Sequence, residues 1–365
     1  MSRRARYTEA DHARWRAALA AGATLAEICS TDPARPPYGT VNSFAQRVKH
    51  EQAQNEPDEV HGWLCLSDEH VGMFVHPEDN NGMYEYSSET AAERFLYLEQ
   101  QIVTHLAACA SRWRLSRLYV PMLGDHLQGE NAYEGCAYRL QITSAEAQMA
   151  EYCSITVPIF TRLAERISTR DDGGPKVVIV GTPGNHSRPA QKGKADPRSS
   201  WERSLYSELE HRLASVPGVC VVRPNGMHRA IRDPLSGLSF LFGHGDGILR
   251  MSHVGSPTPM TFEKIHQCAD HLGCERWDVG VFGHRHVPNM IGGRRSLFTN
   301  GCFCGCNDLA TGQNLKAVDA CQWFLGTSAA GLVWAQNLIL SWPTPTTIDE
   351  VGVVRGDMLG AEAAS

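Results

Sequence analysis

Five short polar clusters, each placed after an apolar segment, constrain the fold of this chain more than any other feature. They are Asp68-Glu69-His70, Gly124-Asp125-His126, Gly184-Asn185-His186, Gly243-His244 and Gly283-His284-Arg285-His286. The apolar segments resemble buried strands, and helical patterns alternate with most of them. Strands that alternate with helices are typical of an α/β sandwich, which binds ligands beyond the C-terminal ends of its strands. The five clusters are therefore expected to meet at one site.

The ligand types in these clusters indicate a metal site. Carboxylates, imidazoles and one amide are the groups that hold divalent cations in proteins. Asp68 and His70 are two residues apart, so in an extended chain their side chains point to the same side and can bind one ion. The carboxylate of Asp125 has two oxygens and can bridge two cations that would otherwise repel each other. The sequence therefore predicts a two-metal hydrolytic site.

The same set of clusters resembles the calcineurin-like metallophosphoesterases, whose pattern is Asp-X-His, Gly-Asp, Gly-Asn-His, a lone Gly-His and Gly-His-X-His. The resemblance covers residues 60 to about 310, and it implies a four-layer αββα sandwich. It also implies two divalent cations, with manganese expected first and iron, zinc, nickel or magnesium as alternatives. The ligands implied for one ion are Asp68, His70, Asp125 and His286, and those for the other are Asp125, Asn185, His244 and His284.

Members of this family cleave phosphomonoesters or phosphodiesters with a water that the metals activate, and the histidine after the asparagine assists the leaving group. That role implies His186 as the catalytic residue. The chain departs from the family at Ser187, where an acidic residue is usual, and at Glu69, where an apolar residue is usual. Three further residues are expected to contact substrate: His126, Asn131 and Arg188. For His126, an ordinary loop histidine is the alternative.

Two basic segments bear on the substrate. The segment 187–203 carries Arg188, Lys192, Lys194, Arg198 and Arg203 and is expected to form a basic loop that neutralises phosphates. A solvated loop without a role is the alternative. The stretch from Ser2 to His50 has eight basic residues against four acidic ones, although the whole chain has a net charge of −6. Its expected helix, turn, second helix and third helix at 41–48 resemble a helix-turn-helix unit, with a structural cap as the alternative.

The expected organisation is a helical unit at 1–50, a linker at 51–59, a metallophosphoesterase domain at 60–345 and a tail at 346–365. The preferred function is hydrolysis of phosphodiester bonds in DNA or another polynucleotide. The alternatives are a phosphatase or phosphodiesterase for small phosphoesters, nucleotides or phosphoproteins, and a DNA-binding module with a vestigial site. The oligomeric state stays open.

Composition favours an ordinary globular protein of the cytoplasm. The net charge of −6 excludes a strongly basic protein that coats nucleic acid. No signal-peptide pattern is recognised, and the apolar stretch 323–342 is too interrupted for a transmembrane helix, so no membrane partner is expected. The twelve cysteines are scattered and are expected to be free thiols. Cys302, Cys304 and Cys306 are likewise expected to be structural thiols that pack as small apolar side chains, with a soft-metal site as the alternative.

Overall fold

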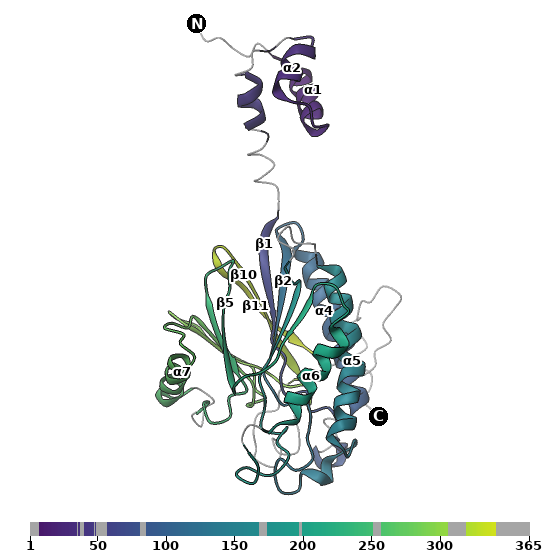
Figure 1. The fold of residues 1–365 in the computed structure, drawn as a ribbon, viewed down its shortest axis with the longest axis vertical. Helices are drawn as coiled ribbons and strands as arrows, with labels where there is room; N and C mark the ends of the chain where they lie inside the picture. Colours follow the sequence, from purple (N-terminus) through teal and green to yellow (C-terminus); the bar gives the residue numbers. More distant parts are fainter. Residues whose placement is uncertain are drawn as a thin grey trace, which may run out of the picture. The chain divides into compact units, whose positions relative to one another are not determined.

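The computed structural model describes residues 7–34, 36, 40–46, 48, 57–80, 85–167, 174–196, 199–250, 257–305 and 319–340. The chain divides into two compact units, Met1–Asp58 and Glu59–Ser365 (Figure 1). Most of the expected linker at 51–59 and the whole expected tail at 346–365 lie outside the described residues, as does Cys306.

The first unit is helical. Helix α1 spans Glu9–Ala20 and helix α2 spans Leu25–Thr31, and residues 40–46 are helical as well. Each of the first two helices begins with a capping box, in which a threonine and the acidic residue three positions later satisfy each other's backbone N–H groups. A small apolar core joins the helices through Trp15, Ile28, Val41, Phe44 and Val48. The predicted helices are therefore present and share a core.

The second unit is built on two β-sheets (Figure 1). The six-stranded sheet has the order β11-β10-β1-β2-β3-β4, and the five-stranded sheet has the order β5-β6-β7-β9-β8. Strands of the first sheet are β1 Asp58–Leu64, β2 Trp113–Met122, β3 Val177–Gly181, β4 Val219–Val222, β10 Cys321–Ser328 and β11 Gly331–Ile339. Strands of the second are β5 His228–Arg232, β6 Ser239–Gly243, β7 Val279–Phe282, β8 Asn289–Ile291 and β9 Ser296–Thr299.

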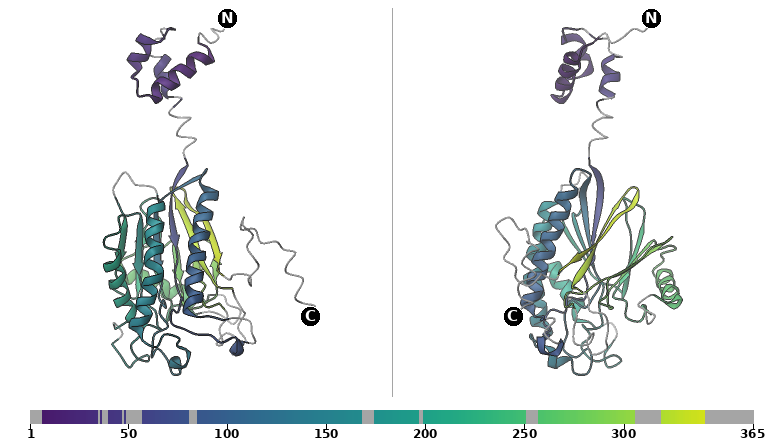
Figure 2. Two further views of the ribbon diagram at one scale, coloured as in Figure 1. Left: turned by 90° about the vertical axis from the view of Figure 1, so that its right-hand side faces the viewer. Right: turned by 180° about the vertical axis from the view of Figure 1, so that it is seen from behind.

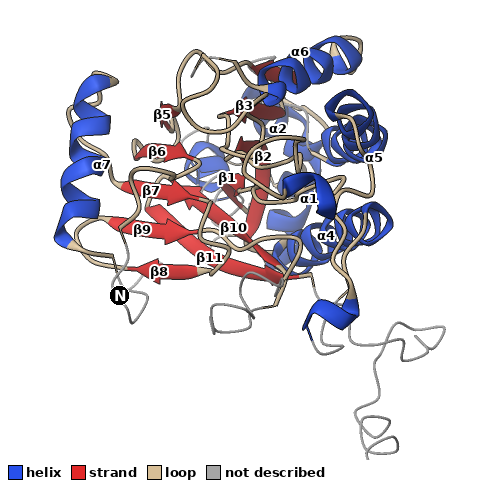
Figure 3. Cartoon of the chain, turned by 90° about the horizontal axis from the view of Figure 1, so that it is seen from below, coloured by secondary structure: helices blue, strands red, loops and turns tan. Residues whose placement is uncertain are grey.

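Helices cover the outer faces of both sheets (Figures 2 and 3). Three pack on the first sheet, namely α4 Ser88–Cys109, α5 Ala145–Arg166 and α6 Trp201–Leu213. Helix α7, Pro259–His271, packs on the second sheet. Between the sheets, the ring of Trp63 on β1 stacks on Phe240 of β6, with centroids 3.7 Å apart. The order of layers is helices, sheet, sheet, helix, so the predicted αββα sandwich is confirmed.

The apolar stretch near residues 323–342 contributes two strands. β10 and β11 pair as an antiparallel hairpin, and β10 continues the first sheet beside β1. Each strand directs one face into the interior of the sandwich, which accounts for the apolar composition of the stretch. Within the described part of the chain, no helix has the length and apolar character that crossing a membrane requires.

Candidate metal centre

The five polar clusters lie at the C-terminal ends of β1, β2, β3, β6 and β7. Parallel pairing joins β2 to β3 and β6 to β7, and the chain beyond β1 bridges to β2 in parallel at Leu66 and Met122. The C-terminal ends of parallel neighbouring strands lie at the same end of a sheet, and here these ends of the two sheets lie next to each other. The topology therefore brings together side chains that are far apart in the sequence.

One group of side chains gathers around the Nε2 atom of His244. The Nδ1 of this ring donates to the carbonyl of Leu123 at 3.1 Å. Nε2 lies 2.9 Å from Asp125 Oδ2, 2.9 Å from Asn185 Oδ1 and 3.2 Å from His284 Nδ1. Four atoms that can act as ligands thus converge on one point. They are the four that the resemblance implies for the second ion.

A second group gathers around His286. Its Nε2 lies 3.3 Å from Asp68 Oδ1 and 3.2 Å from His70 Nε2. The ligand atoms of Asp68, His70 and His286 all lie within 4.8 Å of one another. Asp125 belongs to a similar set with His70 and His186 and to another with His244 and His284. Its carboxylate therefore stands between the two groups, as a bridging ligand must.

Burial and charge in the centre favour bound cations. Asp68, Asp125 and His244 have at most 1 % of their surface exposed. Burial raises the pKa of the Asp125 carboxyl, but the neighbouring histidines outweigh it and hold that pKa well below its usual value. Burial also favours neutral His244, yet Asp125 raises the pKa of this imidazole to about 10. A positive charge is therefore favoured between these residues, whether a proton or a metal cation carries it.

The backbone of the centre adopts an unusual conformation. Five non-glycine residues among those described have positive φ: Asp68, His70, Asp125, His284 and His286, at 57°, 47°, 58°, 70° and 57°. Left-handed backbone costs a non-glycine residue about 1–3 kcal/mol and concentrates at functional sites. All five are predicted ligands. The expected extended conformation at Asp68 and His70 is wrong, and left-handed turns bring their side chains to the centre instead.

Two glycines let the second and third clusters touch. A Cβ on Gly124, whose φ is 94°, would stand 2.4 Å from the backbone nitrogen of Gly184. A Cβ on Gly184 would stand 2.1 Å from Asp125 Oδ1. Neither position has room for a side chain. The close contact of these two loops sets Asp125 beside Asn185 and His186.

A residue that the sequence did not single out holds the same two loops together. Glu202, in the first turn of α6, is fully buried. Its Oε1 accepts the backbone N–H of His126 at 2.6 Å, and its Oε2 accepts that of Gly184 at 2.6 Å. The sequence signal was slight, since an acid near a helix start is usual. Its buried role depends on how the loops pack.

His126 does not have the position expected of a substrate contact. It is fully buried, with Nδ1 2.6 Å from Glu69 Oε2 and Nε2 2.9 Å from the hydroxyl of Tyr206. Burial lowers the pKa of this imidazole, but the Glu69 carboxylate outweighs it and raises the pKa above its usual value. Both ring nitrogens are engaged inside the protein. The expected substrate contact is therefore corrected to an internal pair, which also accounts for the polar residue at position 69.

His186 lies beside the centre and is half-buried. Its backbone N–H donates to Asp125 Oδ1 at 2.7 Å, and its Nδ1 donates to the carbonyl of Gln128 at 3.3 Å. The ring centroid is 4.6 Å from that of His70. Ser187, where the family has an acid, bonds instead to the carbonyl of Gly184. The carbonyl of Gln128 therefore orients the imidazole without an acidic neighbour in sequence.

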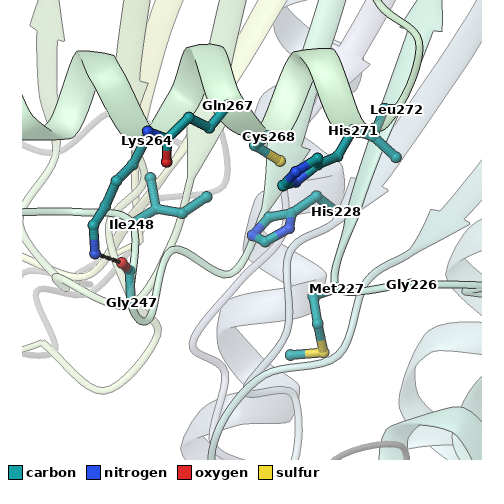
Figure 4. A pocket seen from close by; sticks show the side chains of 10 residues that line it. All are labelled: Gly226, Met227, His228, Gly247, Ile248, Lys264, Gln267, Cys268, His271 and Leu272. Atoms are coloured by element: carbon teal, nitrogen blue, oxygen red, sulfur yellow. Dashed lines mark hydrogen bonds between the residues drawn. The ribbon is translucent and has the colours of Figure 1, made fainter.

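Two surface pockets flank the centre. One of about 430 Å³ is lined by Asn131 and Tyr133 together with residues 189–191 and Lys194 of the basic segment. The other, of about 330 Å³, lies between α7 and the turn before β5 and is lined by His228 and His271 (Figure 4). Because His228 pairs with Gly243 across β5 and β6, this second pocket adjoins the His244 side.

The basic segment is partly occupied by internal contacts. Arg188 Nη2 donates to Asp246 Oδ2 at 2.6 Å, and Arg203 Nη1 donates to the carbonyl of Pro224 at 2.9 Å. Lys192 and Lys194 are exposed, whereas Arg198 lies outside the described residues. Substrate contact by Asn131, which lines a pocket, and by Arg188, which is paired, stays a prediction.

No family model matches this chain, and no curated protein matches it. Solved structures that resemble it include a conserved phosphoesterase-like protein of Streptococcus pneumoniae, with 12% identity over 50% of this chain and 87% of that one at a TM-score of 0.24. A candidate 5'-nucleotidase of Staphylococcus aureus has 10% identity over 80% of this chain and 56% of that one at 0.33. Phosphopantetheinyl hydrolase of Mycobacterium tuberculosis has 12% identity over 68% and 90% at 0.26. The side chains of the centre therefore carry the evidence for function.

Proposed function

We propose that this chain is a metal-dependent phosphoesterase that hydrolyses phosphodiester bonds in DNA or another polynucleotide. One observation carries the proposal: Asp125 belongs to two sets of possible ligand atoms, one with His70 and His186 and one with His244 and His284. A buried carboxylate shared by two nitrogen- and oxygen-rich sets is what a pair of divalent cations requires. Buried structural ion pairs seldom gather so many imidazoles at one point.

The residues present fit two cations. Asp68, His70, Asp125 and His286 would hold one, and Asp125, Asn185, His244 and His284 would hold the other. When bound, two divalent cations supply Lewis acidity to a phosphoryl oxygen and lower the pKa of a water nucleophile. The mixed oxygen and imidazole ligands suit manganese first, with iron, zinc, nickel or magnesium as alternatives.

His186 is the residue of this chain best placed to serve the leaving group. The carbonyl of Gln128 accepts the proton on its Nδ1, so Nε2 of the doubly protonated, imidazolium form is the atom that can deliver a proton to a leaving oxygen. The bond between its backbone N–H and Asp125 keeps the ring next to the centre. His186 would thus act on substrate, while its neighbour Asn185 acts on metal.

A polynucleotide substrate is supported by exposed positive charge near the centre. Lys192 and Lys194 are exposed, and Lys194 lines the pocket that contains Asn131. Flanking phosphates of a polymer gain charge-assisted contacts there that a small phosphoester does not reach. In the first unit, Arg14 is engaged by Asp11 and Asp32, so its charge is partly balanced internally. The segment beside the centre therefore weighs more in this proposal than the helical unit.

An assay panel tests the proposal. Purified protein supplemented with manganese is expected to hydrolyse bis-p-nitrophenyl phosphate and single- or double-stranded DNA faster than p-nitrophenyl phosphate. Hydrolysis of the monoester alone would overturn the nuclease proposal and favour a small-phosphoester enzyme. Protein that takes up no stoichiometric Mn, Fe, Zn or similar ion would overturn the catalytic proposal altogether and favour a vestigial site.

The helical unit has a separate test. Removal of residues 1–50 is expected to weaken DNA affinity and to reduce its dependence on salt, because fewer phosphate contacts release fewer counterions. Hydrolysis of bis-p-nitrophenyl phosphate serves as the control and is expected to be unchanged. Unchanged DNA affinity would assign the unit to a structural role.

A further inference from the structure

Two buried thiols lie against the imidazole of His286 on the side away from the hydrolytic centre. Nε2 of this ring contacts Asp68 and His70, whereas its Nδ1 lies 3.8 Å from the sulfur of Cys304. The sulfur of Cys302 lies within 4.8 Å of the same ring. Both cysteines are fully buried. The two nitrogens of His286 therefore face two different sets of donor atoms.

Sheet topology explains why these donors meet. His286 follows β7 and the cysteines follow β9, and β7 and β9 are parallel neighbours. The loops at their C-terminal ends consequently emerge side by side. The single residue between Cys302 and Cys304 lets both sulfurs approach the same ring. The ligand atoms of His286, Cys302 and Cys304 all lie within 4.8 Å of one another.

A backbone oxygen lies close to both sulfurs. The carbonyl oxygen of Gly305 lies 3.5 Å from the sulfur of Cys302 and 3.9 Å from that of Cys304. Around a zinc ion, bonds of about 2.3 Å to sulfur and 2.0–2.1 Å to nitrogen or oxygen place sulfur-containing donor pairs about 3.5 to 3.8 Å apart. The separations of 3.5, 3.8 and 3.9 Å match that spacing within a few tenths of an ångström.

We propose that His286 Nδ1, the sulfurs of Cys302 and Cys304 and the carbonyl of Gly305 form a separate site for one thiophilic divalent cation such as Zn²⁺ or Cd²⁺. Thiolates select soft cations, whereas the oxygen and imidazole ligands of the hydrolytic centre suit manganese. Each thiol transfers its proton to solvent as its sulfur binds, so the two sulfurs bring two negative charges to the cation. When the hydrolytic centre is filled as well, His286 also releases its remaining ring N–H proton to solvent and holds both cations as an imidazolate. Through its Nε2, His286 connects this site to the hydrolytic centre.

A cation bound at the thiol site would also fix the orientation of His286 in the hydrolytic centre. Metal-ligating histidines usually direct their other ring nitrogen to a carboxylate or carbonyl, which fixes the ring. At His286 that partner is the pair of thiols, and a cation bound there would hold the ring plane. The proposal shares only this residue with the two-metal site and does not depend on hydrolysis.

The test uses the full-length chain after removal of metals with a chelator. Titration with Cd²⁺, with manganese present to fill the hydrolytic centre, is expected to give one equivalent of ultraviolet thiolate-to-cadmium charge-transfer absorption. The double variant Cys302→Ser and Cys304→Ser is expected to lose that absorption while it still binds manganese. Cys153→Ser removes another fully buried thiol from the same core and is the matched control, which should keep the absorption.

Asp125→Asn separates the two sites. This variant is expected to lose the hydrolytic metals and to keep the cadmium absorption, because Asp125 is absent from the thiol site. If the double variant does not fold, Cys304→Ser alone should weaken cadmium binding about tenfold or more. Absence of charge-transfer absorption in the unaltered chain, or an equal loss in Cys153→Ser, would overturn the proposal. Either result would leave manganese-dependent hydrolysis as an independent question.

Discussion

Glu202 accepts the backbone N–H of Gly184 through Oε2 at 2.6 Å, while its Oε1 accepts the N–H of His126, also at 2.6 Å. The two N–H groups belong to the loops that carry Asp125 on one side and Asn185 and His186 on the other. One carboxylate on α6 therefore sets the separation of a bridging ligand and its neighbours. Glu202 is not one of the proposed metal ligands, so it is a positioning residue.

Glu202→Gln is expected to weaken manganese binding about 10- to 100-fold, the usual cost of losing a group that supports a metal ligand. Glutamine keeps one acceptor oxygen, but its NH₂ group faces an N–H, so one of the two loops loses its partner. Titration calorimetry with manganese measures the effect. Glu208→Gln on the same helix is the matched control, because Glu208 is half-exposed and pairs only with Arg212 among its described contacts. Equal affinity in both variants would contradict the positioning role.

Asp125→Asn is expected to deplete both metals. The substitution removes the negative charge that both ligand groups share and leaves a neutral amide between two cations. Metal content measured after gel filtration in manganese should fall from two ions per chain toward none. Asp270→Asn, at an exposed position of α7, should keep both. Retention of one ion by Asp125→Asn would mean that Asp125 serves a single cation.

His186→Ala is expected to lower turnover about 10²- to 10⁴-fold, the range for loss of a general acid, while both metals stay bound. The physical reason is that its Nδ1 is engaged by Gln128 and its ring is not among the ligands assigned to either ion. Steady-state hydrolysis of bis-p-nitrophenyl phosphate and metal content are measured together. His211→Ala, exposed on α6, serves as the control. Loss of metal from His186→Ala would identify the residue as a ligand.

Acid stability should depend on a buried network between the sheets. Asp233 is fully buried and hydrogen-bonds His61 of β1 and Thr327 of β10, with Oδ–N and Oδ–Oγ1 distances of 2.5 and 2.7 Å. Burial raises the pKa of Asp233, but hydrogen bonds from His61, Ser236 and Thr327 outweigh it and lower the pKa to about 2. An unfolded aspartate has a pKa of about 3.9. The ionised carboxylate therefore stabilises the fold above that pH.

The contribution should be about 2 to 3 kcal/mol, fully present above about pH 4 and lost as the pH falls through about 2. Asp233→Asn is consequently expected to lower the free energy of unfolding at pH 7, with a difference from the unaltered chain that narrows toward pH 2. Urea unfolding across that range measures it. Asp270→Asn should show no such change. A pH-independent difference would mean that packing, rather than charge, explains the loss.

Much of the fold was predictable because its core elements are long and regularly patterned. Helices α4, α5 and α6 have apolar residues at helical spacing, and β3 and the second half of β2, residues 118–122, are continuous apolar runs. Strands β5, β8, β10 and β11 were not predicted. β5 and β8 are short and only half-buried, and β11 is half-buried along most of its length. Such strands are stabilised by pairing with neighbours, which a local pattern does not record.

The sequence alone determined which side chains belong to the centre, because ligand types are a property of residues and apolar runs place those residues at strand ends. Tertiary structure alone decided which contacts these side chains make and which of them are buried. The packing of the loops places Glu202 where it accepts backbone N–H groups from two of them, and it buries His126 in a pair with Glu69. The same packing holds Asp68, His70 and Asp125 in the left-handed backbone conformation. Each of these features depends on contacts between segments far apart in the chain, where burial changes the cost of every unpaired charge and N–H group.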